Sequence, residues 1–405
     1  METTNQVRKE AVSYELIRGR LYFIGKDGYK LEVPESMRDV ILTDNHDGRM
    51  AAHGGVHATY QRMKKAFHWP GMWKDVLAYV RSCHKCQTNK VGPSTHIRTG
   101  AVGQGAEHPF HTVSLDIKGP LPTTAKGSRY IISWIDVATR YVEASASATK
   151  DAEAVVESLS ALIARHGVPR RIISDRDMAF LGKVMQLACK RLAIEHDDNP
   201  AYAKWMNGIV ERFHGSIGTS LSHFVNEEDW QWDEQLPYAL YAYRTAYQEK
   251  IQSSPFELVY GRAPRSLSEA VMDVTGSSSA DGMTVDERLA KAMRRREERE
   301  KEPTIATQAA VYKVGDEVML KKTEGRSGLE PRWTGPFKVV SDRKDRVTYL
   351  GWAGKELHAH KNHVFLYNPR IHKPDSEEFT AQDLENVLVN GGTVGTGKGK
   401  RKGSK

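Results

Sequence analysis

The sequence predicts an α/β protein with several domains, and three observations indicate this fold class. Two short apolar runs of the kind found in buried strands end at Asp116 and Asp175. Between them, apolar residues recur with helical spacing from Ala152 to Ile163. Strands that alternate with a helix are typical of a sheet covered by helices. A length of 405 residues leaves room for about two to four domains.

The central domain is predicted to contain several strands around one helix. Val113, Leu115 and Ile117 alternate along one face of the first strand, so Asp116 lies on the other face. The remaining elements follow in chain order: strands from Tyr130 to Asp136 and from Arg140 to Ala144, a helix ended by Gly167 and Pro169, and a strand through Ile172 and Ile173. Asp175 then lies at a carboxyl strand end, where ligand chemistry gathers in such sheets.

Three carboxylates form the candidate catalytic site. Asp116 and Asp175 end strand-like runs, and Glu211 follows in a run predicted to be the first turns of a helix. So placed, the three side chains can converge at one edge of a sheet, where they repel one another unless a divalent cation lies between them. Oxygen ligands suit Mg²⁺ or Mn²⁺, and two such ions about 3.5–4 Å apart serve in-line displacement at phosphorus. The alternative is that these are three surface acids among the 51 of the chain.

The predicted helix of Glu211 has an apolar face and a polar face. The apolar stripe consists of Val210, Phe213, Ile217 and Leu221, and the other face carries Asn207, Glu211, His214 and Gly218. Glu211 is therefore expected to point away from the core, toward the strand ends. The alternative is a structural glutamate paired with Arg212.

A second candidate site lies upstream, where histidines precede a pair of cysteines. Cys83 and Cys86 form a Cys-x2-Cys motif, and His46 and His53 come before it. Two imidazoles and two thiolates complete a tetrahedral zinc site, and a site with four protein ligands is structural rather than catalytic. Three further histidines in the same stretch are alternative ligands: His57, His68 and His84. A chance Cys-x2-Cys beside a histidine-rich stretch is the plainer interpretation.

The composition narrows the classes of protein and partner. The formal net charge is +8 and the isoelectric point is about 9.1, which favours a polyanionic partner such as DNA. No apolar run reaches the ~18–20 residues of a membrane span, so no membrane partner is expected. No signal peptide opens the sequence and there are three cysteines, so a disulfide framework is not expected. Cys189 lies in a helical pattern and is expected in the core.

Four segments of the sequence match the pattern of one family. In chain order they are HDGRMAAHGGVHATYQRMKKAFHWPGMWKDVLAYVRSCHKCQTNK, SLDIKGPLP, IISDRDMAF and NGIVERFHGSI. They resemble the zinc-binding segment, the two aspartate segments and the glutamate segment of retroviral-type integrases, specifically those of gypsy-class LTR retrotransposons and their relatives. Near the C-terminus, Trp333 to Phe337 resembles part of the small β-barrel of these integrases. The resemblance covers residues 15–370.

The resemblance implies a fold and two kinds of metal site. The central domain is RNase H-like, with a small helical zinc-binding domain before it and a small β-barrel after it. One structural Zn²⁺ is bound by His46, His53, Cys83 and Cys86. Two Mg²⁺ or Mn²⁺ ions are bound by the catalytic residues Asp116, Asp175 and Glu211.

The activity that the resemblance implies is that of a DNA integrase, a polynucleotidyl transferase. Such an enzyme trims the 3′ ends of element DNA with metal-activated water and then joins each new 3′-hydroxyl to target DNA. The implied partners are both DNAs and further copies of the chain, as a dimer or tetramer acting in the nucleus. One alternative is a domesticated integrase-derived protein that binds DNA without catalysis, and another is a related nuclease that only cuts.

The predicted domain boundaries follow from these segments. They are an N-terminal extension over 1–45, the zinc-binding domain over 46–90, a linker over 91–108, the catalytic core over 109–262, a linker over 263–310, a DNA-binding β-barrel over 311–368 and a disordered basic tail over 369–405. Four local expectations go with them: two strands around residues 26–28, an apolar stripe of Trp73, Val76, Leu77 and Val80, a solvated helix over 286–302, and a strand–turn–strand over 311–322.

Overall fold

A computed structural model describes most of the chain. The described residues are 13–26, 28–89, 108–174, 182–197, 200–225, 231–249, 251–272, 274, 284, 287–292, 294, 311–322, 329–343, 346–352 and 354–369. The predicted linker 91–108 falls outside these ranges except for its last residue, and the predicted tail falls outside them from residue 370 on. Asp175 also lies outside them, as does the side chain of Glu211.

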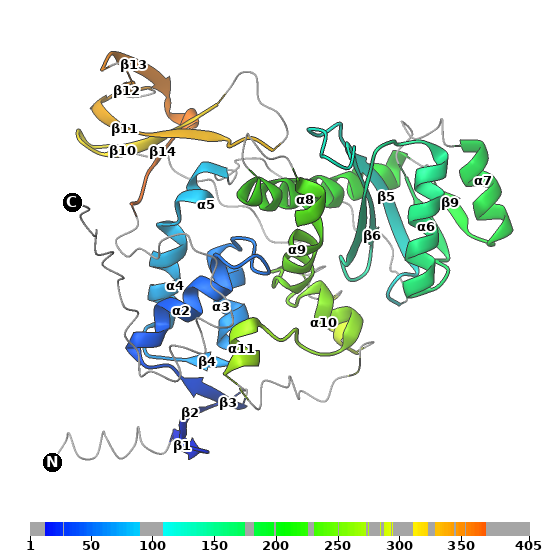
Figure 1. Cartoon of the computed structure of the whole chain (residues 1–405), viewed down its shortest axis with the longest axis horizontal. Helices are drawn as coiled ribbons and strands as arrows, with labels where there is room; N and C mark the ends of the chain where they lie inside the picture. The colour runs from blue at the N-terminus through cyan, green and yellow to red at the C-terminus, as the bar shows by residue number, and fades with distance from the viewer. Residues whose placement is uncertain are drawn as a thin grey trace, which may run out of the picture.

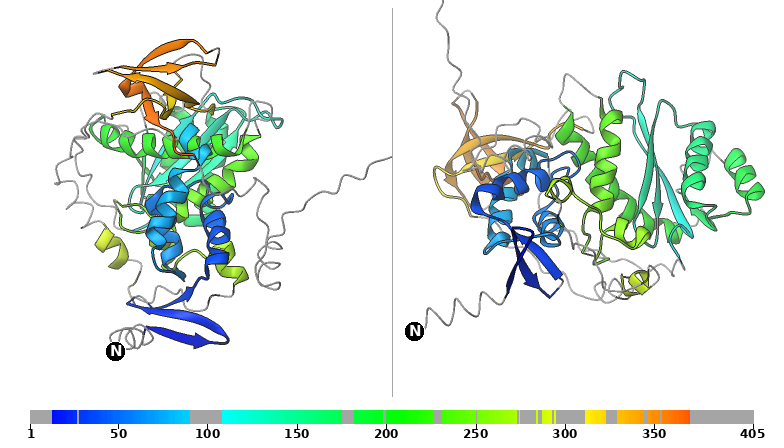
Figure 2. Two further views of the ribbon diagram at one scale, coloured as in Figure 1. Left: turned by 90° about the vertical axis from the view of Figure 1, so that its left-hand side faces the viewer. Right: turned by 60° about the horizontal axis from the view of Figure 1, so that its bottom comes forward.

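The described residues form three bodies (Figure 1). An N-terminal unit of helices with a small sheet lies beside a central sheet flanked by helices, and a second sheet from the C-terminal part of the chain lies next to the end of the N-terminal unit marked α5. Figure 2 shows the N-terminal strands at the opposite end of the helical unit from that second sheet.

The N-terminal unit combines four helices with a four-stranded sheet. The sheet has the order β1-β2-β3-β4, with β1 (Tyr14–Ile17), β2 (Arg20–Gly25), β3 (Gly28–Glu32) and β4 (Phe67–His68). The helices are α2 (Glu35–His46), α3 (Val56–Lys64), α4 (Met72–Arg81) and α5 (His84–Asn89). The boundary predicted at residue 46 is wrong, because His46 ends a helix that begins at Glu35 and because β4 pairs with β3 of the extension.

One hydrophobic core holds the N-terminal unit together. Its fully buried members include Ile41, Met63, Phe67, Trp69 and Val76. The stripe predicted on α4 is wrong in part, because Trp73 is 42% exposed while Met72 and Tyr79 are buried. A helix turns by about 100° per residue, so an inward face that passes through Met72, Val76 and Tyr79 carries Trp73 outward.

The central sheet has the strand order β7-β6-β5-β8-β9. Its strands are β5 (Thr112–Lys118), β6 (Tyr130–Asp136), β7 (Val142–Ser147), β8 (Arg171–Ile173) and β9 (Glu195–Asp197). The first three strands are antiparallel, and β8 and β9 run parallel to β5. The third strand begins at Val142 instead of Arg140, because Arg140 has a left-handed backbone with φ 65°.

Helices cover both faces of this sheet, and this arrangement decides where Asp116 points. The helices are α6 (Ala152–His166), α7 (Gly182–Arg191), α8 (Pro200–Phe224), α9 (Trp232–Thr245) and α10 (Pro255–Tyr260). Val113 and Leu115 pack into the core beneath α6 and α7, which also contains Cys189 as predicted. The other core lies beneath α8 and α9. Asp116, on the alternate face of β5, therefore points toward α8.

Helix α8 is longer than the sequence pattern predicted. It begins at Pro200, so the segment around Glu211 lies in the middle of the helix and not in its first turns. A proline is well suited to the first helical position, and the Ala, Lys and Met residues that follow favour a helix. The predicted apolar stripe is buried, namely Val210, Phe213, Ile217 and Leu221.

Residues 263–310 are not simply a solvated linker. Helix α11 (Leu267–Val271) packs against α2, and Met272 and Val274 join the core of the N-terminal unit. Residues 287–292 are helical, and Leu289 and Ala292 are buried against the central domain. Apolar residues that lie between the charged ones thus anchor this segment to the N-terminal unit and the central domain. The pattern of charges alone did not indicate this anchoring.

The C-terminal sheet is antiparallel and has the order β13-β12-β11-β10-β14. Its elements are β10 (Glu317–Lys321), β11 (Trp333–Asp342), β12 (Arg346–Leu350), β13 (Glu356–His360), the 3-10 helix η2 (Lys361–His363) and β14 (Val364–Leu366). The strand expected just before Gly315 is wrong: residues 311–313 are not in a strand, and Gly315 forms a turn with φ 92°. Tyr312 is buried instead, and its hydroxyl donates to the Val364 carbonyl at 2.8 Å.

No helix among the described residues combines the length and the apolar character needed to cross a membrane.

Candidate functional site

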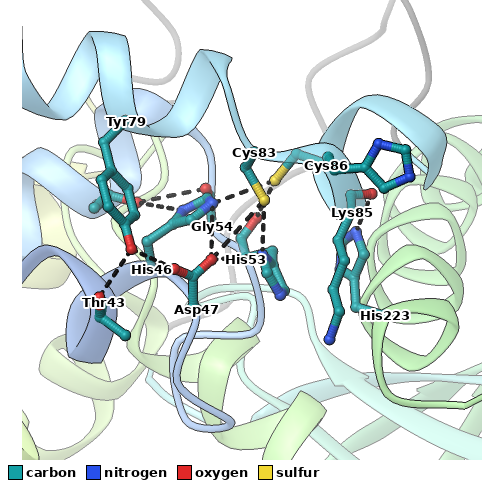
Figure 3. Close-up of polar contacts among 12 residues, drawn as sticks. Thr43, His46, Asp47, His53, Gly54, Tyr79, Cys83, Lys85, Cys86 and His223 are labelled. Atoms are coloured by element: carbon teal, nitrogen blue, oxygen red, sulfur yellow. Dashed lines mark hydrogen bonds and ion pairs between the residues drawn. The ribbon is translucent and has the colours of Figure 1, made fainter. Parts of the chain in front are cut away.

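The four predicted zinc ligands lie together in the N-terminal unit (Figure 3). His46 ends α2, His53 lies in the turn that follows, Cys83 lies between α4 and α5, and Cys86 lies within α5. All four residues are buried, and their ligand atoms lie within 4.8 Å of one another. The turn at His53 has a left-handed backbone with φ 52°, which brings its imidazole back toward the end of α2.

The donor set and its distances fit one tetrahedral zinc ion. Cys83 Sγ lies 3.3 Å from His53 Nδ1, and Cys86 Sγ lies 3.4 Å from His46 Nε2. Zinc bonds of about 2.3 Å to sulfur and about 2.0–2.1 Å to nitrogen at tetrahedral angles place such atoms about 3.5 Å apart. Within the described ranges, this is the group of His, Cys, Asp and Glu side chains close enough to hold a metal ion. Because protein atoms fill all four positions, the site suits a structural ion.

Polar side chains around the cluster orient its ligands. Thr59 Oγ1 lies 3.5 Å from His46 Nδ1, which leaves Nε2 of that ring facing Cys86. Asp47 Oδ1 lies 3.5 Å from His53 Nδ1, the same nitrogen that faces Cys83, so this carboxylate lies beside the donor atoms, and its other oxygen accepts a hydrogen bond from the Tyr79 hydroxyl. A partner such as Thr59, on the ring nitrogen that faces away from the thiolates, fixes ring orientation and ligand basicity. Asp47 was not predicted from the sequence. Its only indication in the sequence is that it follows His46, and an acidic residue next to a metal ligand is too common to be informative.

The environment favours the zinc-binding protonation states of His53 and Cys86, whereas the hydrogen bond to Cys86 and burial raise the pKa of Cys83, which keeps its proton without the ion. Burial lowers the pKa of His53, so its imidazole is neutral at pH 7. A hydrogen bond from Cys83 is the main reason that the pKa of Cys86 falls well below its usual range, and the imidazoles of His46 and His53 lower it further. A neutral imidazole and a thiolate are the zinc-binding forms of these side chains.

The three alternative histidines lie outside the cluster. His57 Nδ1 lies 3.8 Å from Glu249 Oε1, His68 Nδ1 lies 2.6 Å from Glu32 Oε2, and His84 Nδ1 lies 3.4 Å from the Tyr367 hydroxyl. The geometry therefore favours the ligand set that the resemblance implies over the other choices that spacing left open.

Asp116 lies on the face of β5 that α8 covers, and its side chain is 27% exposed. His214 of α8 places Nδ1 3.0 Å from Asp116 Oδ2. Ser133 is the partner of Asp116 in the ladder between β5 and β6, and its hydroxyl donates to the Asp116 carbonyl at 3.0 Å. This carboxylate is thus held by a histidine at an accessible edge and has no arginine or lysine ion pair among the described residues.

The structure describes the other two predicted acids only through the elements that carry them. Strand β8 runs parallel to β5 as far as the pair Ser114↔Ile173, so the strand that leads to Asp175 runs beside the strand of Asp116. Glu211 belongs to α8 and precedes His214 by less than one helical turn. The elements that carry all three acids thus meet in one region, and the convergence of the three carboxylates stays a prediction.

Helix α5 links the zinc cluster to the two other bodies. His223, near the end of α8, places Nε2 3.1 Å from the Lys85 carbonyl, and its ring lies 4.6 Å from the ring of His53 (Figure 3). Gln87 exchanges two hydrogen bonds of 2.7 Å with the backbone of Asn368, which follows β14. A helix that contains one zinc ligand therefore contacts both the predicted catalytic helix and the C-terminal sheet.

Two family models match the chain. The model of the integrase zinc binding domain matches residues 33–92, and the model of the integrase core domain matches residues 106–203. The first match begins just before α2, in agreement with the helix that precedes His46. The second match contains Asp116 and Asp175 and ends before Glu211.

Relatives extend the match over most of the chain. The chain is 26% identical over 345 residues to the Retrovirus-related Pol polyprotein from transposon 412 of Drosophila melanogaster, a match that covers 82% of this chain and 28% of the polyprotein. It is 22% identical over 340 residues to Gypsy retrotransposon integrase-like protein 1 of Rattus norvegicus, with coverages of 82% and 63%. The chain thus spans less than two thirds of the length of either relative.

Among solved structures, a chain of the simian T-cell lymphotropic virus intasome in complex with PP2A regulatory subunit B56 gamma matches at 17% identity and a TM-score of 0.38. The match covers 78% of this chain and 95% of that chain. Because this score is low, the fold assignment rests on the family models and the described topology, which confirm the predicted fold class. The chain carries the zinc-binding and core domains of an integrase, and its resemblance to the retroviral-type integrases of gypsy-class retrotransposons is confirmed.

Proposed function

We propose that this chain is a DNA integrase that processes the 3′ ends of element DNA and joins them to target DNA. The observation that carries the proposal is the accessible Asp116 carboxylate on β5, which faces the helix that also bears Glu211. A buried structural carboxylate would be neutralised by a cation or by several N–H donors. Among the described residues Asp116 has no arginine or lysine partner and one side-chain contact, to His214, and it belongs to an integrase core domain.

The donor chemistry at this edge fits a divalent ion. Asp116 offers hard carboxylate oxygens, which Mg²⁺ and Mn²⁺ prefer, and we propose that Asp175 and Glu211 complete the set. Two bound ions would supply charge stabilisation at the scissile phosphate and would lower the pKa of the attacking hydroxyl or water. The chain itself holds the carboxylates in place and positions the DNA, so the chemistry requires no serine, tyrosine or cysteine nucleophile.

The C-terminal sheet is the proposed DNA-binding surface. Its exposed charged side chains are mostly basic, namely Lys313, Lys321, Lys338, Arg343, Arg346 and Lys355, and the described exposed acid among them is Glu356. Trp352 lies among them and is 79% exposed. Lysine and arginine bind phosphates without reading the sequence, and an exposed aromatic ring can stack on an unpaired base. This surface therefore suits contacts to the DNA backbone that position the duplex at the core.

We also propose that the working species is a dimer or tetramer on DNA and that it acts in the nucleus. Integration joins two element ends to one target, and a single active site cannot join both at once. The protein therefore needs at least two copies of the Asp116 site around the same DNA.

A strand-transfer assay tests the proposed function. The full chain is incubated with Mg²⁺, labelled duplexes that carry candidate element ends, and a supercoiled plasmid as the target. We expect shortened 3′ ends and duplexes covalently joined to the plasmid. Asp116→Asn should bind the duplex and yield neither product, whereas Ser216→Ala, at an exposed position of α8, should act as wild type.

Two other results would decide for the alternatives. DNA binding without cutting or joining, in either Mg²⁺ or Mn²⁺, would establish the domesticated DNA-binding protein. Asp116-dependent cutting without joining would establish a nuclease.

A further inference from the structure

We propose that His214 is a positioning residue: together with Lys118, it orients the Asp116 carboxylate and fixes the register of α8 against β5. This inference rests on the proposed function, because it assigns a role around a carboxylate that is proposed to bind metal. Two separate contacts carry it, one to the side chain of His214 and one to its backbone.

The side-chain contact determines which ring nitrogen of His214 carries a proton. A carboxylate oxygen only accepts hydrogen bonds, so His214 Nδ1, which lies 3.0 Å from Asp116 Oδ2, carries a proton. This nitrogen therefore acts as a donor to the carboxylate and cannot itself bind a metal ion. The second ring nitrogen lies 3.4 Å from Ser133 Oγ on β6. The ring thus lies against two neighbouring strands. Because the Ser133 hydroxyl already donates to the Asp116 carbonyl, the contact that orients the ring is the one to Asp116, and one oxygen of Asp116 is committed to it.

The backbone contact comes from the same strand. Lys118 Nζ donates to the His214 carbonyl at 2.8 Å. Asp116 and Lys118 are two positions apart on β5, so both side chains leave the same face of the strand. One strand therefore holds a single helical residue at two points, by its side chain and by its carbonyl. Two such points oppose both rotation of α8 about its axis and sliding along it.

Gly218 makes room for this contact. A Cβ atom at Gly218 would lie 2.6 Å from Lys118 Nζ. Glycine is unfavourable within a helix because it adds backbone entropy to the unfolded chain. The structure explains why a glycine lies in the middle of α8: without a side chain at Gly218, Lys118 can reach across the helix to the carbonyl of His214, one turn earlier.

The register matters because Glu211 lies on the same helix. Residues three positions apart are neighbours on a helix surface, so Glu211 and His214 share a face of α8. A contact that fixes His214 against Asp116 also fixes where the backbone of Glu211 stands relative to that carboxylate. Functional sites require such geometry to within about 0.5 Å, and a helix free to slide would not provide it.

The test measures Mn²⁺ binding to the full-length, zinc-loaded protein by electron paramagnetic resonance, beside nicking of supercoiled plasmid. His214→Leu removes both ring nitrogens and should weaken Asp116-dependent Mn²⁺ binding and nicking by roughly 10–100-fold, as loss of other partners of metal ligands does. His214→Asn keeps an N–H donor near the position of Nδ1 and should stay within about threefold of wild type. His214→Gln is the matched control, because its donor lies one methylene further out and should not restore binding.

Gly218→Ala separates positioning from stability. Alanine favours a helix more than glycine does, so the melting temperature should not fall. Its methyl group displaces Lys118 from the His214 carbonyl, and nicking should fall by a smaller factor than in His214→Leu. Wild-type nicking in Gly218→Ala would show that Lys118 has no part in positioning.

Asp116→Asn provides the reference. In that background, His214→Leu should have no further effect on Mn²⁺ binding, because the two residues act through one carboxylate. If Asp116→Asn weakens Mn²⁺ binding and His214→Leu does not, or if His214→Asn is no better than His214→Leu, the positioning role is wrong and the proposed function stands. If Asp116→Asn itself leaves Mn²⁺ binding unchanged, the proposed function fails at this site.

Discussion

The zinc cluster and the edge at Asp116 are two candidate metal sites built on opposite plans. The four zinc ligands are at most 5% exposed, and their donor atoms lie within 4.8 Å of one another. The Asp116 side chain is 27% exposed, and its described side-chain contact engages one carboxylate oxygen. The first site combines sulfur and nitrogen donors in a closed shell, and the second offers hard oxygen donors at an open edge.

This difference in donors and exposure predicts a different role for the ions at each site. A closed shell leaves no position for a substrate. Binding of zinc in such a shell therefore stabilises the packing of helices that are too short to be stable alone. The Asp116 carboxylate is partly exposed, so we expect ions bound there to contribute to a reaction. The comparison therefore predicts that removing zinc impairs folding and that removing the catalytic ions impairs chemistry.

Removal of zinc should have the largest effect. Structural zinc contributes about 10–16 kcal/mol in small zinc domains, which is comparable to the whole stability of a domain, about 5–15 kcal/mol. A chelator or Cys83→Ser is therefore expected to unfold α2 to α5 while the central sheet stays folded. Hydrogen exchange measured by segment checks this outcome. Protein purified without chelators should contain about one zinc per chain, and its absence would show that the cluster is not a zinc site.

Removal of a catalytic carboxylate should have the next largest effect, on rate and not on folding. Asp116→Asn, Asp175→Asn and Glu211→Gln each remove a negative charge with little change of volume. Loss of this charge should remove several kcal/mol of transition-state stabilisation by the bound ions. This corresponds to a drop of at least about 10³-fold in the rate of strand transfer. DNA affinity measured by fluorescence anisotropy and zinc content should both stay at wild-type values. Near wild-type activity in any one variant removes that residue from the site.

Deletion of residues 311–405 should weaken DNA binding and leave both metal sites formed. With about six to ten bound phosphates, the affinity of the full chain should fall roughly 10³–10⁵-fold between 50 and 200 mM salt. The deletion removes the basic sheet, so the slope of log affinity against log salt should become shallower by about one for each phosphate that the shorter chain does not bind. Joining of two ends should stop. A titration in which both proteins show the same slope would show that the sheet does not bind DNA.

Separation of the C-terminal sheet from α5 should have the smallest effect. Gln87→Leu removes two hydrogen bonds of 2.7 Å to Asn368 and should cost about 1–3 kcal/mol in the docking of the sheet. Faster hydrogen exchange in β14, with unchanged zinc content, is the expected result. Lys85→Ala is the matched control, because Lys85 is exposed and His223 contacts its carbonyl only. Equal exchange in the two variants would show that Gln87 does not hold the sheet.

Features that depend on the spacing of nearby residues could be predicted from the sequence. The alternation of Val113 and Leu115 placed Asp116 on the opposite face of β5, because side-chain direction in a strand has a fixed period. The spacing of Cys83 and Cys86 indicated zinc, because two cysteines separated by two residues suit one ion. The apolar stripe of α8 was predicted for the same kind of reason, since its period is that of the helix.

Features that depend on tertiary contacts could not be predicted in this way. Helical periodicity placed His214 on the face of Glu211, but its contact with Asp116 depends on how α8 lies against β5. The burial of Leu289 depends on a distant surface at Ala138, so the charge pattern around it suggested a solvated helix. Trp73 was assigned to the core because its spacing also fits a helical stripe, and the packing of Met72 decided otherwise.

The most direct test of two separate metal sites compares Cys83→Ser with Asp116→Asn in the same two measurements. One is the hydrogen-exchange protection of α2 to α5, and the other is Mn²⁺ binding by the full chain. We predict a crossed result: Cys83→Ser loses the protection and keeps Asp116-dependent Mn²⁺ binding, whereas Asp116→Asn keeps the protection and loses the Mn²⁺ binding. Wild-type Mn²⁺ binding and strand transfer in Asp116→Asn would contradict the assignment of two sites.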